Sequence, residues 1–289
     1  MLQSVSGIGI DAARVHRDAP FHQLSLCFAR ERFRVARQDP PWKVVRAFGS
    51  LVHLNNVSGG VLAGDRLALD VEVQAGAAAQ ITTTGATRLY RHRPGAADSE
   101  QHARFSVGDG AILEYLPDTV IPYAGSCHWQ RTEIRLGRGS TLFWWEMFAP
   151  GRLAAGERFA FDRLRVQAEV YAGSLPVLRE NYLLEPKNKD LSALVRMLDY
   201  SHTASLCIVQ EGRPQTFWRA LEDQLNETAR RRTQHGQAVW GASMLASEGV
   251  IVRGLSASGC FLHETLIEFW RAARVAVTGV DAVPPRKIY

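Results

Sequence analysis

One short pattern occurs three times in the first half of the chain, as Val73-Gln74-Ala75-Gly76-Ala77, Val107-Gly108-Asp109-Gly110-Ala111 and Leu136-Gly137-Arg138-Gly139-Ser140. Each copy has an apolar residue, two spacers, a glycine and a small residue, and a strand-like segment follows it. The copies recur roughly 30 residues apart, a spacing typical of stacked structural repeats. The pattern therefore predicts repeated passage of the chain through one kind of β-rung, not alternation of strands with helices.

Strand patterns extend on both sides of these turns. The clearest is Arg66 to Val73, where apolar side chains alternate with polar or small ones. Further strands are predicted at 22–34, 43–48, 79–84, 102–107, 112–116, 130–136, 141–148, 158–171, 177–184 and 249–255. Two helices are predicted near the end, one from Pro214 to Arg230 and one from Phe261 to Val277. The predicted fold class is mainly β, with β-helix-like stacked sheets and two α-helices in the C-terminal half, as a single domain over residues 1–289.

Composition places the chain among ordinary globular proteins, with 46% apolar and 22% charged residues and a net charge of +5. The four cysteines, Cys27, Cys127, Cys207 and Cys260, form no CxxC pair, which favours reduced thiols and a cytoplasmic location. Residues 1–11 lack the features of a secretory signal, and no apolar run is long enough to span a bilayer. Arginine supplies most of the positive charge, in clusters at 30–37, 88–93 and 230–232 that suit solvated faces or protein interfaces.

The loop from Ser58 to Arg66 has the glycine spacing of a phosphate-binding loop. Asp65 and Arg66 stand where such a loop needs lysine and Ser or Thr, so nucleotide binding is not expected. Asp65 is expected instead to cap local N–H groups. Thr82-Thr83-Thr84 has two interpretations: an ordinary strand end with a tight turn, or a smooth lining for a passage or a close contact.

Cys127-His128 is an adjacent pair of soft metal ligands. Neighbours in a strand point to opposite faces, so both reach one ion only from a turn; the alternative is a structural cysteine beside a surface histidine. Trp144 and Trp145 likewise lie on opposite faces of one strand. One face belongs to the core, and the other belongs to a second packed layer or presents an aromatic anchor to a partner. The chain has no GxSxG motif or locally paired carboxylates, and nothing in it requires an enzyme.

An ordered set of short blocks, densest from 55 to 160, resembles the urease accessory protein family UreD, also called UreH. The blocks are Gly59-Gly60 with Gly64-Asp65, Thr82-Thr83-Thr84 with Ala86-Thr87-Arg88 and Tyr90-Arg91, Leu113-Glu114-Tyr115-Leu116-Pro117 with Ile121 and Ser126, Trp145-Glu146 with Gly151-Arg152 and Gly156-Glu157-Arg158-Phe159, and Pro285-Arg286-Lys287-Ile288-Tyr289. One departure is Asn55-Asn56-Val57-Ser58, where the family usually has Asn-Pro-Gly.

The resemblance implies a maturation factor that is not an enzyme. Members bind UreF and, through it, the GTPase UreG, and dock this complex onto apo-urease. GTP hydrolysis then accompanies nickel insertion, with UreE as the expected nickel donor. The implied fold is β-helix-like with a pair of helices, and members are thought to carry nickel along an internal polar passage. No tightly bound cofactor is expected, only transient nickel. A dimer within the accessory complex is compatible with this role, whereas nucleic acid and membranes are not expected partners.

Carboxylates in the matched blocks are the first candidates for the nickel path: Asp65, Glu114 and Glu146, with Cys127 and His128 as weaker ones. Alanine at Asp65 or Glu146 is expected to lower urease activation while leaving the protein soluble. Candidates for partner binding are Trp144, Trp145 and Arg152. Two other functions stay open at this point. One is a β-solenoid carbohydrate-active enzyme, which requires acidic residues along one groove. The other is a basic nucleic-acid-binding protein, which predicts steeply salt-dependent binding.

Overall fold

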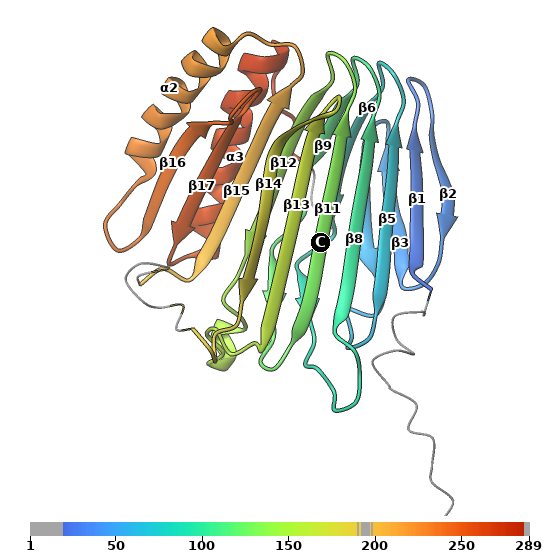
Figure 1. The fold of residues 1–289 in the computed structure, drawn as a ribbon, viewed down its shortest axis with the longest axis vertical. Coiled ribbons are helices and arrows are strands. Elements are labelled where there is room, and N and C mark those ends of the chain that lie inside the picture. Colours follow the sequence, from blue (N-terminus) through green and yellow to red (C-terminus); the bar gives the residue numbers. More distant parts are fainter. Residues whose placement is uncertain (1–19, 190, 192–196, 198, 286–289) are drawn as a thin grey trace, which may run out of the picture.

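A computed structural model describes residues 20–189, 191, 197 and 199–285. In this part of the chain the strands form a seven-stranded sheet A and a ten-stranded sheet B (Figure 1). Sheet A contains β1 (His22–Phe28), β2 (Phe33–Gln38), β5 (Arg66–Val73), β8 (Ser99–Val107), β11 (Cys127–Leu136), β13 (Arg163–Ala172) and β14 (Leu175–Leu184). Sheet B contains β3 (Trp42–Phe48), β4 (Leu51–Asn56), β6 (Ala78–Thr83), β7 (Thr87–Leu89), β9 (Ile112–Tyr115), β10 (Val120–Pro122), β12 (Thr141–Phe148), β15 (His202–Gln210), β16 (Ala238–Met244) and β17 (Val250–Ser256).

The chain crosses between the sheets at each glycine turn, from β5 to β6, from β8 to β9 and from β11 to β12. Equivalent strands are parallel neighbours, and the turns stack on one another: the N–H of Gly76 donates to the carbonyl of Asp109 at 2.9 Å, and that of Gly110 to Arg138 at 2.8 Å. The predicted β-helix-like rungs and the mainly β class are therefore confirmed. Antiparallel strands close each end of the stack.

Close stacking explains the glycine at position 108. A Cβ atom there would lie 2.7 Å from the backbone nitrogen of Ala75 in the preceding turn, which cannot move independently of the sheet. We expect Gly108→Ala to lower the free energy of unfolding by about 1–3 kcal/mol in urea titrations. Gly85→Ala is the matched control, because a Cβ at Gly85 meets no atom within 4 Å. Equal stability of the two variants would contradict this account of the turns.

Several predicted boundaries were wrong. The strand predicted at 22–34 is two strands, β1 and β2, because the chain reverses after Phe28 and the N–H of Ala29 bonds to the carbonyl of Arg32. The strand predicted from 158 begins at 163, after Phe159 adopts a left-handed backbone conformation with φ of 52°. Strands β4, β7, β10, β15 and β16 were not predicted. The expectations about residues 1–11 and the terminal block at 286–289 lie outside the described residues.

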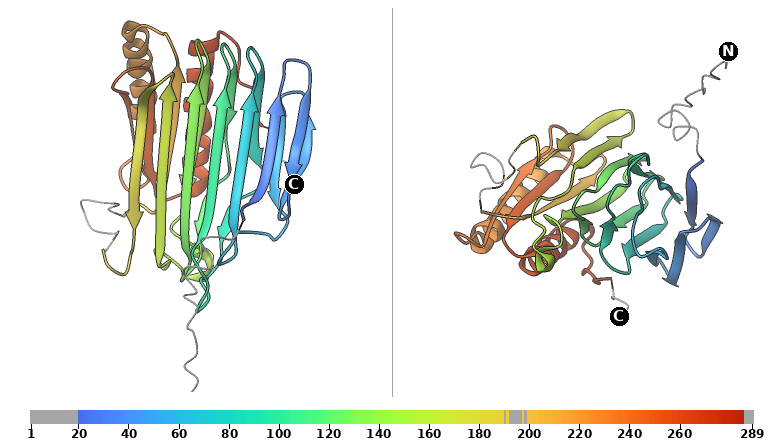
Figure 2. Two further views of the ribbon diagram at one scale, coloured as in Figure 1. Left: turned by 45° about the vertical axis from the view of Figure 1, so that its right-hand side comes forward. Right: turned by 90° about the horizontal axis from the view of Figure 1, so that it is seen from below.

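Both predicted helices are present, as α2 (Gln215–Arg232) and α3 (Gly259–Thr278), with a short 3₁₀ helix η1 (Leu153–Ala155) before them. The side chain of Ser258 caps the start of α3, and Gly279 ends it in a left-handed conformation. Both helices lie beside the C-terminal strands, at the opposite end of the sheets from β1 and β2 (Figures 1 and 2). No helix within the described residues has the length and apolar character needed to cross a membrane.

Strand β12 separates two hydrophobic cores. Trp144 belongs to the core between the sheets, and Trp145 to the core between sheet B and the helices. Their side chains are 2% and 1% exposed. The second packed layer is therefore the correct interpretation. The prediction that Trp144 or Trp145 anchors a partner was wrong, because α3 covers the outward face of β12 and neither ring is available on the surface. The indole N–H of Trp145 donates to the carbonyl of Pro117 at 2.8 Å.

Candidate functional site

Glu146 is a carboxylic acid inside the layer between the two sheets. It follows Trp144 by two positions in β12, so alternation places both side chains on the inward face of sheet B. The residue is 5% exposed. Its carboxyl group accepts a hydrogen bond from the side-chain amide of Gln130, which comes from β11 on the facing sheet. Burial of a charged carboxylate with a single amide partner costs free energy, so a functional reason for a carboxyl group at this position is expected.

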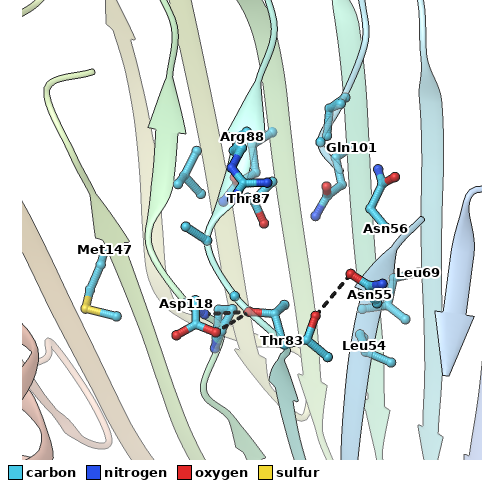
Figure 3. A pocket seen from close by; sticks show the side chains of 18 of the residues that line it. Leu54, Asn55, Asn56, Leu69, Thr83, Thr87, Arg88, Gln101, Asp118 and Met147 are labelled. Carbon is cyan, nitrogen blue, oxygen red and sulfur yellow. Dashed lines mark hydrogen bonds between the residues drawn. The ribbon is translucent and has the colours of Figure 1, made fainter. Parts of the chain in front are cut away.

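One cavity of about 240 Å³, here called the polar cavity, lies between the sheets at the strand ends opposite the glycine turns. Its polar lining includes Asn55, Thr83, Gln101, Asp118, Gln130 and Glu146. Hydrogen bonds hold several of these side chains in place. The hydroxyl of Thr83 donates to the carboxylate of Asp118 at 2.9 Å (Figure 3). The hydroxyl of Thr84, which also lines the cavity, donates to Asn55 at 3.0 Å. The threonine segment thus ends strand β6, and Thr83 and Thr84 line a cavity, while a passage through the protein stays a prediction.

A second cavity of about 700 Å³, here called the apolar cavity, lies on the other side of Glu146. Its lining is mostly aromatic and aliphatic, and includes Phe148, Phe161, Tyr182, Met197 and Leu255. Its polar members include Glu180 and Arg253, which form an ion pair with each other. Among the described residues that line either cavity, Glu146 alone lines both. Its carboxyl group therefore stands at the junction of a polar and an apolar space.

Burial raises the pKa of Glu146 to about 8, with a further contribution from the nearby Glu180 and a smaller opposing one from the bond to Gln130. The group is therefore mostly protonated at neutral pH when the protein is folded and ionised when it is unfolded. Burial also raises the pKa of Tyr115, which lines the polar cavity, and of Tyr182, which lines the apolar one. Glu146, Tyr115 and Tyr182 are therefore uncharged or mostly uncharged at neutral pH, beside the charged pair of Glu180 and Arg253.

This raised pKa makes stability depend on pH in a definite direction. Below pH 4.5 both states carry the proton; between pH 4.5 and about 8 unfolding releases it, so the contribution of Glu146 to stability falls as the pH rises. As the pH rises through this window, the free energy of unfolding of Glu146→Gln should increase relative to that of the wild type by on the order of 1 kcal/mol per pH unit. Urea titrations of both proteins at pH 5.5 and 7.5 measure the difference, and a pH-independent difference would contradict the assignment.

Neither Asp65 nor Glu114 lines the two cavities at which Glu146 lies. The carboxylate of Asp65 accepts a hydrogen bond from the N–H of Leu62 at 2.8 Å, as expected for a turn cap, and Asp65 lines neither cavity. Glu114 is buried on the outward face of sheet B, bound to Arg274 of α3 at 2.6 Å and to Gln80. Burial raises its pKa against the opposing effects of Arg274 and Gln80. Arg274 also donates to the carbonyls of Val280 and Asp281, so this ion pair fastens α3 and the following segment to the sheet.

Removing the cation from this pair is expected to be costly. Arg274→Met leaves a buried carboxylate with only Gln80, and we expect a loss of roughly 2–4 kcal/mol in unfolding free energy. Arg271→Met on the same helix is the control, since Arg271 is exposed. The double variant Arg274→Met/Glu114→Gln should recover part of the loss, because the uncompensated charge is gone. No recovery would show that the ion pair is not the cause.

Cys127 and His128 are the first two residues of β11 and point to opposite faces, as regular strand geometry requires. The interpretation of His128 as a surface histidine was wrong, because β11 places its ring between the sheets, where it is 1% exposed. Its Nδ1 lies 2.8 Å from the hydroxyl of Ser99, and burial lowers its pKa to about 3. Burial raises the pKa of the Cys127 thiol to about 11. In the described part of the chain, no three His, Cys, Asp or Glu side chains are grouped so as to hold a metal ion.

Arg152 lies on the surface after β12, where it forms an ion pair with Glu157 and stacks over Tyr123, 4.2 Å from the ring centre. Its placement leaves it accessible to a partner, unlike the two tryptophans. Sequence reasoning missed Gln101, Asp118 and Gln130 as cavity-lining residues. Of these, only Gln130 lies in a predicted strand, at the start of 130–136, and no motif marks it; Gln101 and Asp118 lie outside the strands predicted at 102–107 and 112–116.

Comparison with known proteins yields a consistent result. The family model described as "UreD urease accessory protein" matches residues 21–288. A protein of Herpetosiphon aurantiacus named "Urease accessory protein UreD" is 41% identical over 265 residues, covering 90% of this chain and 92% of its own length. Proteins with the same description from Pseudomonas paraeruginosa (32% identical, 79% and 76% covered) and Methylorubrum populi (33%, 78% and 71%, numbered UreD 3) are also similar.

Proposed function

Because this chain belongs to the UreD family of urease accessory proteins, we propose that it is a scaffold that joins UreF, and through it the GTPase UreG, to apo-urease, and that nickel moves through its interior. The family is one of accessory proteins and not of enzymes. The observation that carries the nickel proposal is the carboxyl group of Glu146 at the junction of the two cavities. UreE as the nickel donor and a cytoplasmic location belong to the same proposal.

The chemistry around Glu146 suits transit of a divalent cation. Hydrated Ni²⁺ loses much solvation free energy on entering an apolar interior, so a passage needs oxygen or nitrogen ligands along the way. In the polar cavity these are the carboxylates of Asp118 and Glu146 and the side-chain amides of Asn55, Gln101 and Gln130. The amide nitrogen of Asn56, also in the lining, is buried without a hydrogen-bond partner in the described structure, which leaves it for water.

Proton exchange at Glu146 lowers the affinity for Ni²⁺ and so allows the ion to leave. With a pKa of about 8, the carboxyl group must release its proton to bind Ni²⁺, and it takes a proton back when the ion leaves. The proton competes with the metal, so the affinity stays low enough for release. A set of thiolates and imidazoles would hold nickel more tightly and would suit storage instead.

Co-purification tests the scaffold role. The tagged chain is expressed with UreF, UreG and apo-urease, and the eluted complex is resolved by size and by mass spectrometry. We expect all four proteins in one complex, and nickel in the urease after GTP and nickel are added. Recovery of the tagged chain without urease would contradict the proposal. Capture of nucleic acid lost steeply with salt would favour the alternative of a nucleic-acid-binding protein.

A further inference from the structure

The end of the β-stack opposite the glycine turns carries a surface cluster of tyrosine and arginine side chains with one leucine. It is here called the Tyr–Arg surface and consists of Leu62, Tyr90, Arg91, Arg93, Tyr123 and Arg152. These residues line a surface cavity of about 510 Å³. Three of them, Leu62, Tyr90 and Tyr123, are far apart in sequence and come together because each follows the same point of a successive rung. Val61 bridges Leu89, and Leu89 pairs with Pro122. The next residues, Leu62, Tyr90 and Tyr123, are therefore neighbours in a ladder.

Aromatic contacts join the side chains of this ladder. The rings of Tyr90 and Tyr123 meet edge to face with centroids 5.3 Å apart, and the guanidinium of Arg152 lies over Tyr123. Glu157 holds Arg152 in place and also accepts the N–H of Ala124 at 3.0 Å. Rigid aromatic and arginine side chains with little conformational entropy to lose are typical of protein-binding hot spots.

The charge of the surface is positive and largely uncompensated. Arg91 and Arg93 are exposed, and neither forms an ion pair with a carboxylate in the described part of the chain. Arg91 donates to the carbonyl of Ala124 at 3.4 Å and otherwise only helps to lower the pKa of Glu157 at longer range. No carboxylate is among the described residues that line this cavity. By contrast, arginines on the outer face of sheet A, such as Arg104, Arg131 and Arg179, are each paired with a carboxylate.

Exposed aliphatic side chains complete the surface. Leu62 is 39% exposed within it, Val57 is exposed in the loop that precedes Leu62, and Leu153 is exposed at the start of η1, directly after Arg152. Arginine, tyrosine and exposed aliphatic groups together match the composition of protein interfaces. A nucleic-acid site would instead extend the positive charge along a strand-length groove.

We propose that the Tyr–Arg surface binds a segment of a partner protein in which carboxylates alternate with apolar side chains. The carboxylates pair with Arg91 and Arg93, and the apolar groups cover Leu62 and the tyrosine rings. The surface borders the polar cavity, because Tyr90 and Arg88 both donate to the carbonyl of Gly59, which lines that cavity. A partner bound here therefore sits beside the cavity. The inference rests on the proposed function only in that a scaffold has protein partners.

Fluorescence anisotropy with a labelled peptide of alternating glutamate and leucine tests this directly. We expect the wild-type chain to bind it at least about tenfold more tightly than Arg91→Glu/Arg93→Glu does, with binding weakened by salt. Arg32→Glu/Arg34→Glu is the matched control, since both arginines are exposed in the hairpin between β1 and β2, and it should bind like the wild type. A peptide with glutamine in place of glutamate should bind as weakly as the double variant.

Three outcomes would overturn the proposal: no binding of the acidic peptide, equal binding by Arg91→Glu/Arg93→Glu, or equal binding of the glutamine peptide. Tighter binding of an oligothymidine through the same arginines would overturn it in favour of nucleic acid. None of these results depends on urease activation. The scaffold role can therefore fail while this surface still binds the peptide. Equally, the surface can fail to bind the peptide while the complex with urease still forms.

Discussion

Urease activated through a complex containing the Glu146→Gln variant is expected to acquire at least about tenfold less nickel at limiting metal than urease activated through the wild-type complex. Glutamine keeps the size of the side chain and a hydrogen bond to Gln130, but it cannot become the anion that replaces water around Ni²⁺. The fold should persist, because the native carboxyl group is already mostly neutral at pH 7. Nickel analysis of the purified urease, together with its activity, measures the effect.

Glu133→Gln serves as the control for this variant. Glu133 is on the outer face of sheet A, paired with Arg131 and Arg135, and its loss leaves both cavities unchanged. The control should activate urease like the wild type. Full activation through the Glu146→Gln complex at limiting nickel would remove Glu146 from the path. Recovery of activity at high nickel would be consistent with a conduit that is impaired but not closed.

Truncation of Trp145 is expected to have the largest effect on stability. Trp145→Ala removes a fully buried ring from the core between sheet B and the helices, along with the hydrogen bond to Pro117, and should cost about 3–5 kcal/mol. The ring also meets Trp270 of α3 edge to face at 6.1 Å, so α3 loses part of its packing surface. Urea unfolding and the yield of soluble protein measure the loss.

Two further tryptophan variants separate burial from ring chemistry. Trp145→Phe keeps most of the buried area and should lose less than half as much stability. Trp129→Ala removes a half-buried ring from the outer face of sheet A, where it stacks with Arg165, and should cost about 1 kcal/mol. A partner anchor would behave differently: Trp145→Ala would then unfold like the wild type and lose only complex formation.

The repeated turn predicted the architecture well because it reports a local requirement. Each rung must turn closely over the preceding one, and at Gly108 only glycine avoids a backbone clash. Helix α3 was likewise predictable from its apolar spacing and from Gly279 after its end. Strand β16 was missed because Gly241 and small residues weaken its pattern; the strand is stabilised by pairing with β17 and by contact with α2.

The candidate site was only partly predictable for a related reason. Alternation along Trp144-Trp145-Glu146 puts Glu146 on the face of Trp144, but which face lies between the sheets depends on the helices that cover the other. The same limit applies to Glu114, which the matched block favoured for the nickel path. Its inward or outward orientation is decided by β9 pairing in sheet B and by the distant Arg274. Asp118 and Gln130 belong to no motif, and the fold alone brings them to one cavity.

Locating nickel within the protein tests the central claim most directly. Crystals soaked in a nickel salt above pH 8, where the carboxyl group of Glu146 can ionise, would be measured at the nickel absorption edge. The account predicts an anomalous peak beside Glu146 at the junction of the two cavities, and its absence from crystals of Glu146→Gln. Peaks confined to surface histidines in both proteins, with the junction empty, would contradict it.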